Sequence, residues 1–136
     1  MLESTLKNFK EKRDSAFLRQ TSISVEYLKK DLNDSLSAAI AKLPDSGLAT
    51  VNSVQMSYLF DENNNLFRNL DFFFDADCDD NVISTSYTAL GNFNVISRVF
   101  EVFLNELRAL DYVYVDDTYL NDENMRGIYI TIALNN

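Results

Sequence analysis

The sequence predicts an α+β domain with two layers: N-terminal helices, then a five-stranded and mainly antiparallel sheet with one inserted helix (ααβββαββ). Two periodicities predict it. Apolar residues recur every three or four positions over 1–43 and 94–110, as in helices that bury one face. In the segments between and after these, they alternate with polar residues, as in half-buried strands. The length of 136 residues suits one domain, so residues 1–136 are expected to share a single core.

The N-terminal helical part is expected to span residues 1–43. Its second half, from Val25 to Leu43, has an apolar stripe with steps of three and four. Thr21, Ser22 and Ser24 interrupt the pattern before that stripe, and hydroxyl side chains of this kind cap helix N-termini. Two helices are therefore favoured over one long kinked helix. The first stretch has these apolar residues at near-helical spacing: Leu2, Leu6, Phe9, Ala16 and Phe17.

The remaining residues, 48–136, are expected to form the sheet and the inserted helix. The first three strands are predicted as an antiparallel meander at 53–60, 66–74 and 82–90, with a turn at 61–65 and an acidic loop at 75–81. Residues 94–110 carry the strongest helical stripe of the chain. Two further strands, at 112–115 and 128–134, are expected to be joined by an acidic loop at 116–126.

The last predicted strand has little polar character on either face, because Ile128, Ile130 and Ile132 alternate with Tyr, Thr and Ala. We expect it at an edge of the sheet. An apolar edge strand exposes unpaired backbone groups to other chains. These three isoleucines are therefore the predicted self-association residues, and a homo-oligomer or membership of an assembly is expected.

Charge is distributed unevenly along the chain, whose formal net charge is −9 with a pI near 4.3. Residues 1–43 contain eight Lys and Arg against six acids, whereas residues 44–136 contain four Arg against fifteen acids. Phosphate contacts require cations, so direct nucleic-acid binding is not expected. A basic protein is the partner that this charge favours.

The composition excludes several kinds of site. With no histidine, the chain has neither a histidine-activated nucleophile nor His-ligated zinc. Cys78 is the only cysteine, so no intramolecular disulfide forms, and its acidic neighbours Asp77 and Asp79 disfavour a reactive thiolate. No signal peptide or bilayer-spanning run is present, which predicts a soluble, cytoplasmic protein without membrane contact.

Asp75, Asp77 and Asp79 have the spacing that opens a calcium-binding EF-hand loop. The rest of the motif is missing, because Asp80 stands where the turn needs glycine and Ser86 where a bidentate glutamate belongs. We therefore expect no metal and no cofactor. A looser Ca²⁺ or Mg²⁺ site in these acids, serving a metal-dependent enzyme, remains the weakest alternative.

The favoured function is a non-enzymatic acidic protein-binding module of inhibitor, immunity or chaperone type, one form of which is a phage-encoded nucleic-acid mimic. Carboxylates would steer a basic partner and aromatic residues would hold it. The main alternative is a structural subunit of a phage particle or another oligomeric assembly. The predicted partner-binding residues are Asp75, Asp77, Asp79, Asp80, Asp116, Asp117, Tyr119, Asp122 and Glu123.

The predicted order of elements resembles that of the small acidic secretion chaperones of bacteria. They share the size, the acidity and a core of one helix, three strands, one helix and two strands. This chain differs in its last element, which is predicted as a strand where those chaperones have a helix, and it carries no diagnostic motif. The resemblance is one of topology and implies the fold.

Overall fold

A computed structural model describes residues 1–74, 78–88 and 93–134, with Leu18 and residues 78–88 described by their backbone alone. In these ranges, the strands form one antiparallel five-stranded sheet in the order β3-β2-β1-β5-β4. The α+β class and the order of strands and long helices along the chain are therefore confirmed. The elements are α1 (Leu2–Leu18), α2 (Val25–Ile40), α3 (Asp45–Thr50), β1 (Val51–Asp61), β2 (Asn65–Phe74), β3 (Cys78–Thr88), α4 (Phe93–Arg108), β4 (Val113–Asn121) and β5 (Met125–Leu134).

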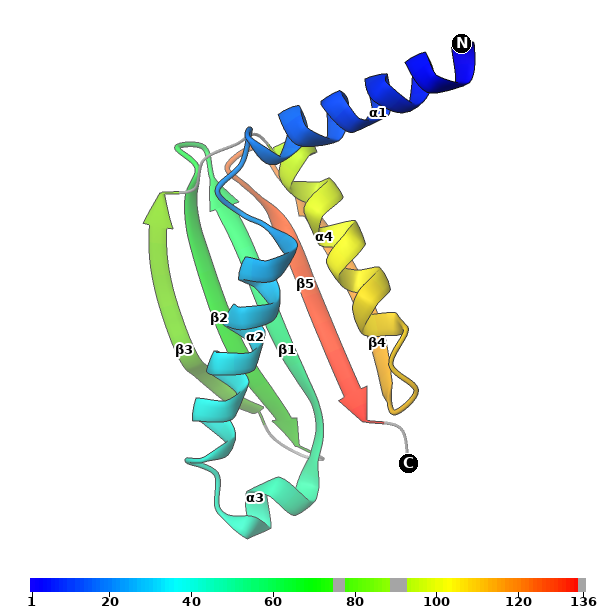
Figure 1. The fold of residues 1–136 in the computed structure, drawn as a ribbon. Helices are drawn as coiled ribbons and strands as arrows, with labels where there is room; N and C mark the ends of the chain where they lie inside the picture. Colours follow the sequence, from blue (N-terminus) through cyan, green and yellow to red (C-terminus); the bar gives the residue numbers. More distant parts are fainter. Residues whose placement is uncertain (75–77, 89–92, 135–136) are drawn as a thin grey trace.

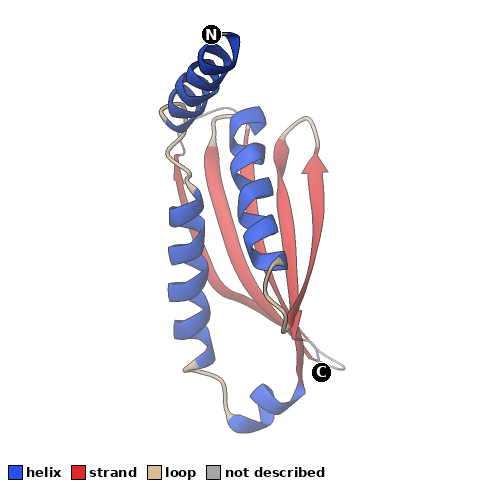
Figure 2. Ribbon diagram, turned by 45° about the vertical axis from the view of Figure 1, so that its right-hand side comes forward, coloured by secondary structure: helices blue, strands red, loops and turns tan. Residues whose placement is uncertain are grey.

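Helices α2 and α4 cover one face of the sheet, and the core lies between the two layers (Figures 1 and 2). Strand β1 shows why the helices pack against the sheet. Its apolar residues alternate along the strand, so that they share the face toward the helices. Tyr58 is fully buried there, with its ring centroid 5.4 Å from that of Phe100 on α4. The other buried residues of this face of β1 are Val54, Met56 and Phe60.

The prediction of two N-terminal helices is confirmed. The side chain of Ser24 accepts a hydrogen bond from the backbone N–H of Tyr27 and caps α2. Just before it, the hydroxyl oxygen of Thr21 accepts from the N–H of Ile23 at 3.0 Å, and Ile23 is fully buried. The segment between α1 and α2 is thus anchored in the core by Ile23.

The predicted edge position of the last strand is wrong. β5 lies between β1 and β4, and it pairs with both. Ile128 and Ile130 point toward the helices and are at most 1% exposed, while Ile132 is half-buried. Side-chain polarity does not distinguish an edge strand from an interior one, because neighbouring strands pair with the backbone while the side chains point above and below the sheet. The backbone of β5 is paired on both sides. These three residues therefore form no free edge, and the sheet ends at β3 and β4 instead.

Two predicted loops also differ from the structure. The acidic segment 116–126 is mostly strand: β4 continues to Asn121, which pairs with Arg126, so only residues 122–124 connect β4 to β5. The acids of β4 are accommodated because it is an edge strand with exposed positions. The second is the acidic loop expected at 75–81, of which residues 78–81 already belong to β3. A short helix that was not expected, α3, precedes β1, and Pro44 is its N-terminal flanking residue.

Candidate protein-binding surfaces

The predicted partner-binding residues do not share one end of the sheet. Asp79 and Asp80 lie near the start of β3, which is one edge strand of the sheet. Asp116 lies on β4, the opposite edge strand, with three strands between them. Asp122 and Glu123 occupy the β4–β5 turn. Asp75 and Asp77 lie outside the described residues. In the part of the chain that the structure describes, these residues therefore do not form one continuous acidic surface.

On β4, two of the predicted residues are engaged with α4. Asp117 forms an ion pair with Arg108, whose Nε also donates to the backbone oxygen of Val115 at 3.4 Å. The hydroxyl of Tyr119 donates to Glu101, and partial burial together with this carboxylate raises the pKa of the phenol. Asp117 and Tyr119 thus attach the edge strand to the helix above it. Asp116 points to the other side of the strand and is exposed.

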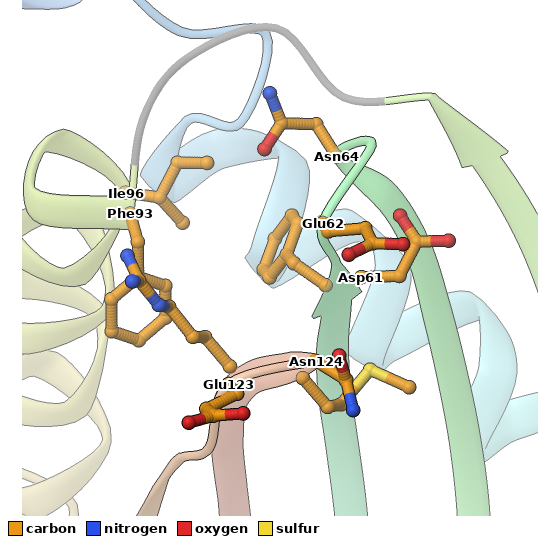
Figure 3. Close-up of a pocket in the computed structure, with 10 residues that line it drawn as sticks. Asp61, Glu62, Asn64, Phe93, Ile96, Glu123 and Asn124 are labelled. Atoms are coloured by element: carbon orange, nitrogen blue, oxygen red, sulfur yellow. The ribbon is translucent and has the colours of Figure 1, made fainter.

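A different acidic site forms where two turns meet. The β1–β2 turn and the β4–β5 turn lie at the same end of the sheet because β1 pairs antiparallel with β5 (Figure 1). Between them and the start of α4 is a hollow of about 280 Å³ (Figure 3). Its lining residues are Phe60, Asp61, Glu62, Asn64, Phe93, Ile96, Glu123, Asn124, Met125 and Arg126. We call it the turn-end hollow.

The β1–β2 turn holds its own carboxylate in place. Asp61 accepts hydrogen bonds from the N–H groups of Asn63 and Asn65 at 2.9 and 2.8 Å, and from the side-chain amide of Asn65 at 3.1 Å. Asn64 supplies the left-handed residue, with φ of 61°. The bonds from Asn65 and Asn63 lower the pKa of Asp61. Its charge is therefore retained at neutral pH, next to the exposed Glu62.

The floor of the turn-end hollow is aromatic and aliphatic. Phe60 and Phe93 meet edge to face with centroids 6.5 Å apart, and Ile96 lies beside them from α4. Three acids and one cation line the same space: Asp61, Glu62, Glu123 and Arg126. An apolar floor with a net negative rim suits a side chain that has an apolar stem and a positive end.

A second hollow is lined mostly by apolar residues, with Lys29, Asn33, Asn52 and Ser53 as its polar members. It lies between α2 and α4 over the end of the sheet near α3, with a volume of about 490 Å³. Leu32, Leu36 and Ile40 of α2 form one wall. Leu107 of α4 and Leu110, which follows that helix, form the other. Ile40 and Leu110 are 42% and 39% exposed, so apolar surface is open to solvent here. We call it the apolar groove.

Sequence reasoning missed both surfaces. Residues 61–65 were expected to form a turn and were not considered as a binding site, although Asp61 and Glu62 make this turn acidic. The convergence with Glu123 depends on the pairing of β1 with β5, which are more than sixty residues apart in the chain. The apolar groove depends on the spacing of two helices over a sheet, for which the sequence holds no local signal.

Comparison of the chain with protein-family models, with curated proteins and with solved structures gives no match. Within residues 1–74, 78–88 and 93–134, no three Cys, Asp or Glu side chains are arranged to hold a metal ion. In the same ranges, no helix has the length and apolar character needed to cross a bilayer.

Proposed function

We propose that the protein is a non-enzymatic binding module that engages a basic protein partner through the turn-end hollow. The observation that carries the proposal is the convergence of two acidic turns from different hairpins around an apolar floor. Asp61, Glu62 and Glu123 supply the negative charge, and Phe60, Phe93 and Ile96 supply the apolar contact.

The chemistry of the hollow favours a lysine or arginine of the partner. The methylene stem of such a side chain would lie against Phe93, which is half-buried, while its charged end would reach Glu62 and Glu123. A cation next to an aromatic ring also gains from the ring's negative face. The formal net charge of −9 adds long-range attraction, which speeds encounter with a cationic surface at low salt.

Arg126 opposes this binding. It lines the same hollow and is exposed, so its guanidinium would compete with the partner's cation for the two glutamates. Arg126→Gln is therefore expected to tighten the complex, while the loss of Glu62 and Glu123 weakens it. If one of these substitutions strengthens binding and the others weaken it, loss of folding cannot explain both effects.

The test is affinity capture from a nuclease-treated native lysate at low and high salt, with quantitative identification of the retained proteins. The variant is Glu62→Gln/Glu123→Gln. Its matched control is Glu3→Gln/Glu11→Gln, which removes the same charge from the exposed helix α1. A basic protein retained by the wild type and the control, and lost about tenfold from the turn-end variant and at high salt, is the expected result.

Two results would reject the proposal. Equal capture by the turn-end variant and the control would mean that these carboxylates do not contact the partner. Retention that is indifferent to salt, or that involves only acidic proteins, would mean that charge does not govern the interaction.

A further inference from the structure

The outer side of β4 is an edge of the sheet, because β5 is the only strand that pairs with it among the residues that the structure describes. An edge strand presents a row of backbone N–H and C=O groups with which a strand of another chain can pair. In β4 this row runs from Val113 to Asn121. What these groups contact therefore decides whether the edge can accept another strand.

The β4–β5 turn shows which residues of β4 face outward. In an antiparallel pair, the N–H and C=O of one residue point to the same side of the strand, and successive residues point to opposite sides. The N–H of Asp122 donates to the backbone oxygen of Met125 at 2.9 Å, so Asp122 faces β5. The register between β4 and β5 is continuous. The even-numbered residues of β4 therefore also face β5, and the odd-numbered residues face the outer edge.

Side chains occupy two of the outward groups in the middle of the strand. The N–H of Asp117 donates to the carboxylate of Asp116 at 3.0 Å, and Nε of Arg108 donates to the backbone oxygen of Val115 at 3.4 Å. Arg108 is held in this position because it also forms an ion pair with Asp117. Since the oxygen of Val115 points away from β5, the guanidinium lies beside the outer edge of β4.

The acids of β4 also oppose pairing with a second copy of the same strand. Asp117 is the central residue of β4. An antiparallel pair of two β4 strands about their centres would place Asp117 directly opposite its own copy, with Asp116 next to it in each strand. Like charges directly opposite each other destabilise a pair of strands.

We propose that Arg108, Asp116 and Asp117 close the outer edge of β4 to the addition of another strand. An added strand has to bond the central backbone groups of β4, so it must displace a guanidinium from Val115 and a carboxylate from Asp117. Hydrogen bonds to ionised groups are stronger than those between neutral groups, so this displacement is unfavourable. The proposal is independent of the turn-end hollow, because none of the residues lining that hollow belongs to β4.

The first test is sedimentation velocity of a variant with an open edge, Arg108→Ala/Asp116→Ala/Asp117→Thr, over a range of concentrations. This variant is expected to self-associate about tenfold more tightly than the wild type, because the outward backbone groups can then pair with a second copy. Circular dichroism with a melting curve checks that it folds. The matched control removes one cation and two acids from exposed positions of α1 and should behave as the wild type: Lys12→Ala, Glu3→Ala and Glu11→Ala together.

The second test is amide hydrogen exchange measured by NMR, which locates the effect on β4. Asp116→Ala is a single substitution at an exposed position, and it removes the acceptor of the Asp117 N–H. The protection of this amide, relative to an unstructured chain, is expected to fall about tenfold. In the open-edge variant, the outward amides of Val113 and Tyr119 should become protected as the protein concentration rises. In the wild type they should show no such dependence.

Any one of three results overturns the proposal. One is a folded open-edge variant that associates no more tightly than the wild type. Another is protection of the Val113 and Tyr119 amides that rises with concentration in the wild type, since the edge would then already pair with another chain. The third is equal protection of the Asp117 amide in the wild type and in Asp116→Ala, and this measurement decides the matter if the open-edge variant does not fold.

Discussion

Arg68 on β2 and Asp31 on α2 form an ion pair between the sheet and the helix that covers it. Asp31 is only 8% exposed, and both of its oxygens have partners: one contacts Arg68, and the other accepts from the hydroxyl of Tyr58 on β1 at 2.8 Å. Arg68 also reaches the hydroxyl of Tyr27 at 3.5 Å. This polar cluster connects α2 to two strands inside an otherwise apolar layer.

Removing one member of the pair should cost more than removing both. Arg68→Met leaves a buried carboxylate without its cation and is expected to lower the free energy of unfolding by about 3 kcal/mol. Asp31→Leu/Arg68→Met removes the uncompensated charge and should recover most of that loss. Urea denaturation of the two single variants and the double variant gives the coupling energy. Losses that simply add would show that the pair is not coupled.

Gly127 in β5 permits a close approach between β5 and β1. A Cβ at this position would lie 2.1 Å from the backbone oxygen of Tyr58 and 2.8 Å from the Cα of Leu59, which pairs with Gly127 across the strands. Both contacts involve backbone, and a strand inside a sheet has no freedom to move away. Glycine is thus required here for space.

Gly127→Ala is expected to destabilise the protein by about 3 kcal/mol, at the upper end of the cost of overpacking. Gly47→Ala is the matched control, because its nearest contacts would be at 3.6 Å or more and it lies within α3. Alanine in a helix is favoured over glycine, so this control should be neutral or slightly stabilising. Thermal unfolding of both variants checks the difference, and equal melting temperatures would contradict the steric argument.

The fold class was predictable because helix and strand periodicities differ along this chain. The stripe in α4 and the alternation in β1 both reflect burial on one face, which is a local property of the sequence. The position of β5 was not predictable in the same way. Its Ile128–Ile132 segment is apolar on both faces. That pattern fits an edge strand that pairs with another chain as well as it fits a strand between two neighbours.

The candidate sites were less predictable than the fold. Asp117 and Tyr119 looked like loop residues because their acidic surroundings obscured the strand pattern of β4, whereas in the structure they bond to α4. The turn-end hollow unites Glu62 with Glu123 through a strand pairing that no local pattern specifies. Whether any of these acids binds a partner stays a prediction.

The stability that Asp61 contributes to the β1–β2 turn should depend on pH. Its pKa is lowered from 3.8 by the hydrogen bonds that it accepts in the folded state. A carboxyl with a lowered pKa stabilises the fold above its ordinary pKa, and this contribution is lost as pH falls through the lowered value. Asp61→Ala should therefore reduce the melting temperature at pH 7 and make no difference in strong acid.

Melting curves of Asp61→Ala and the wild type from pH 7 down to pH 2 measure this effect. Glu62→Ala is the control, since it removes an exposed acid from the same turn. A reduction in melting temperature that persists unchanged in strong acid would show that Asp61 acts through contacts unrelated to its charge.

The raised pKa of Tyr119 predicts that the protein loses stability at alkaline pH. Partial burial and the bond to Glu101 raise its pKa above the ordinary 10.0. Below pH 10 the phenol is protonated in both the folded and the unfolded chain, so its contribution is complete there. Above pH 10 the unfolded chain releases the proton while the folded chain retains it, and the contribution is lost as pH rises toward the folded pKa.

Tyr119→Phe should thus reduce stability at pH 8 and differ progressively less from the wild type as pH rises above 10. Urea denaturation at several pH values gives this trend, with Tyr114→Phe as the control for losing a hydroxyl from the opposite face of β4. Absorbance titration of the folded wild type should also show a tyrosine that ionises at a higher pH than it does in the unfolded chain. A Tyr119→Phe deficit that is constant from pH 8 to 11 would mean that the hydrogen bond to Glu101 does not hold the proton.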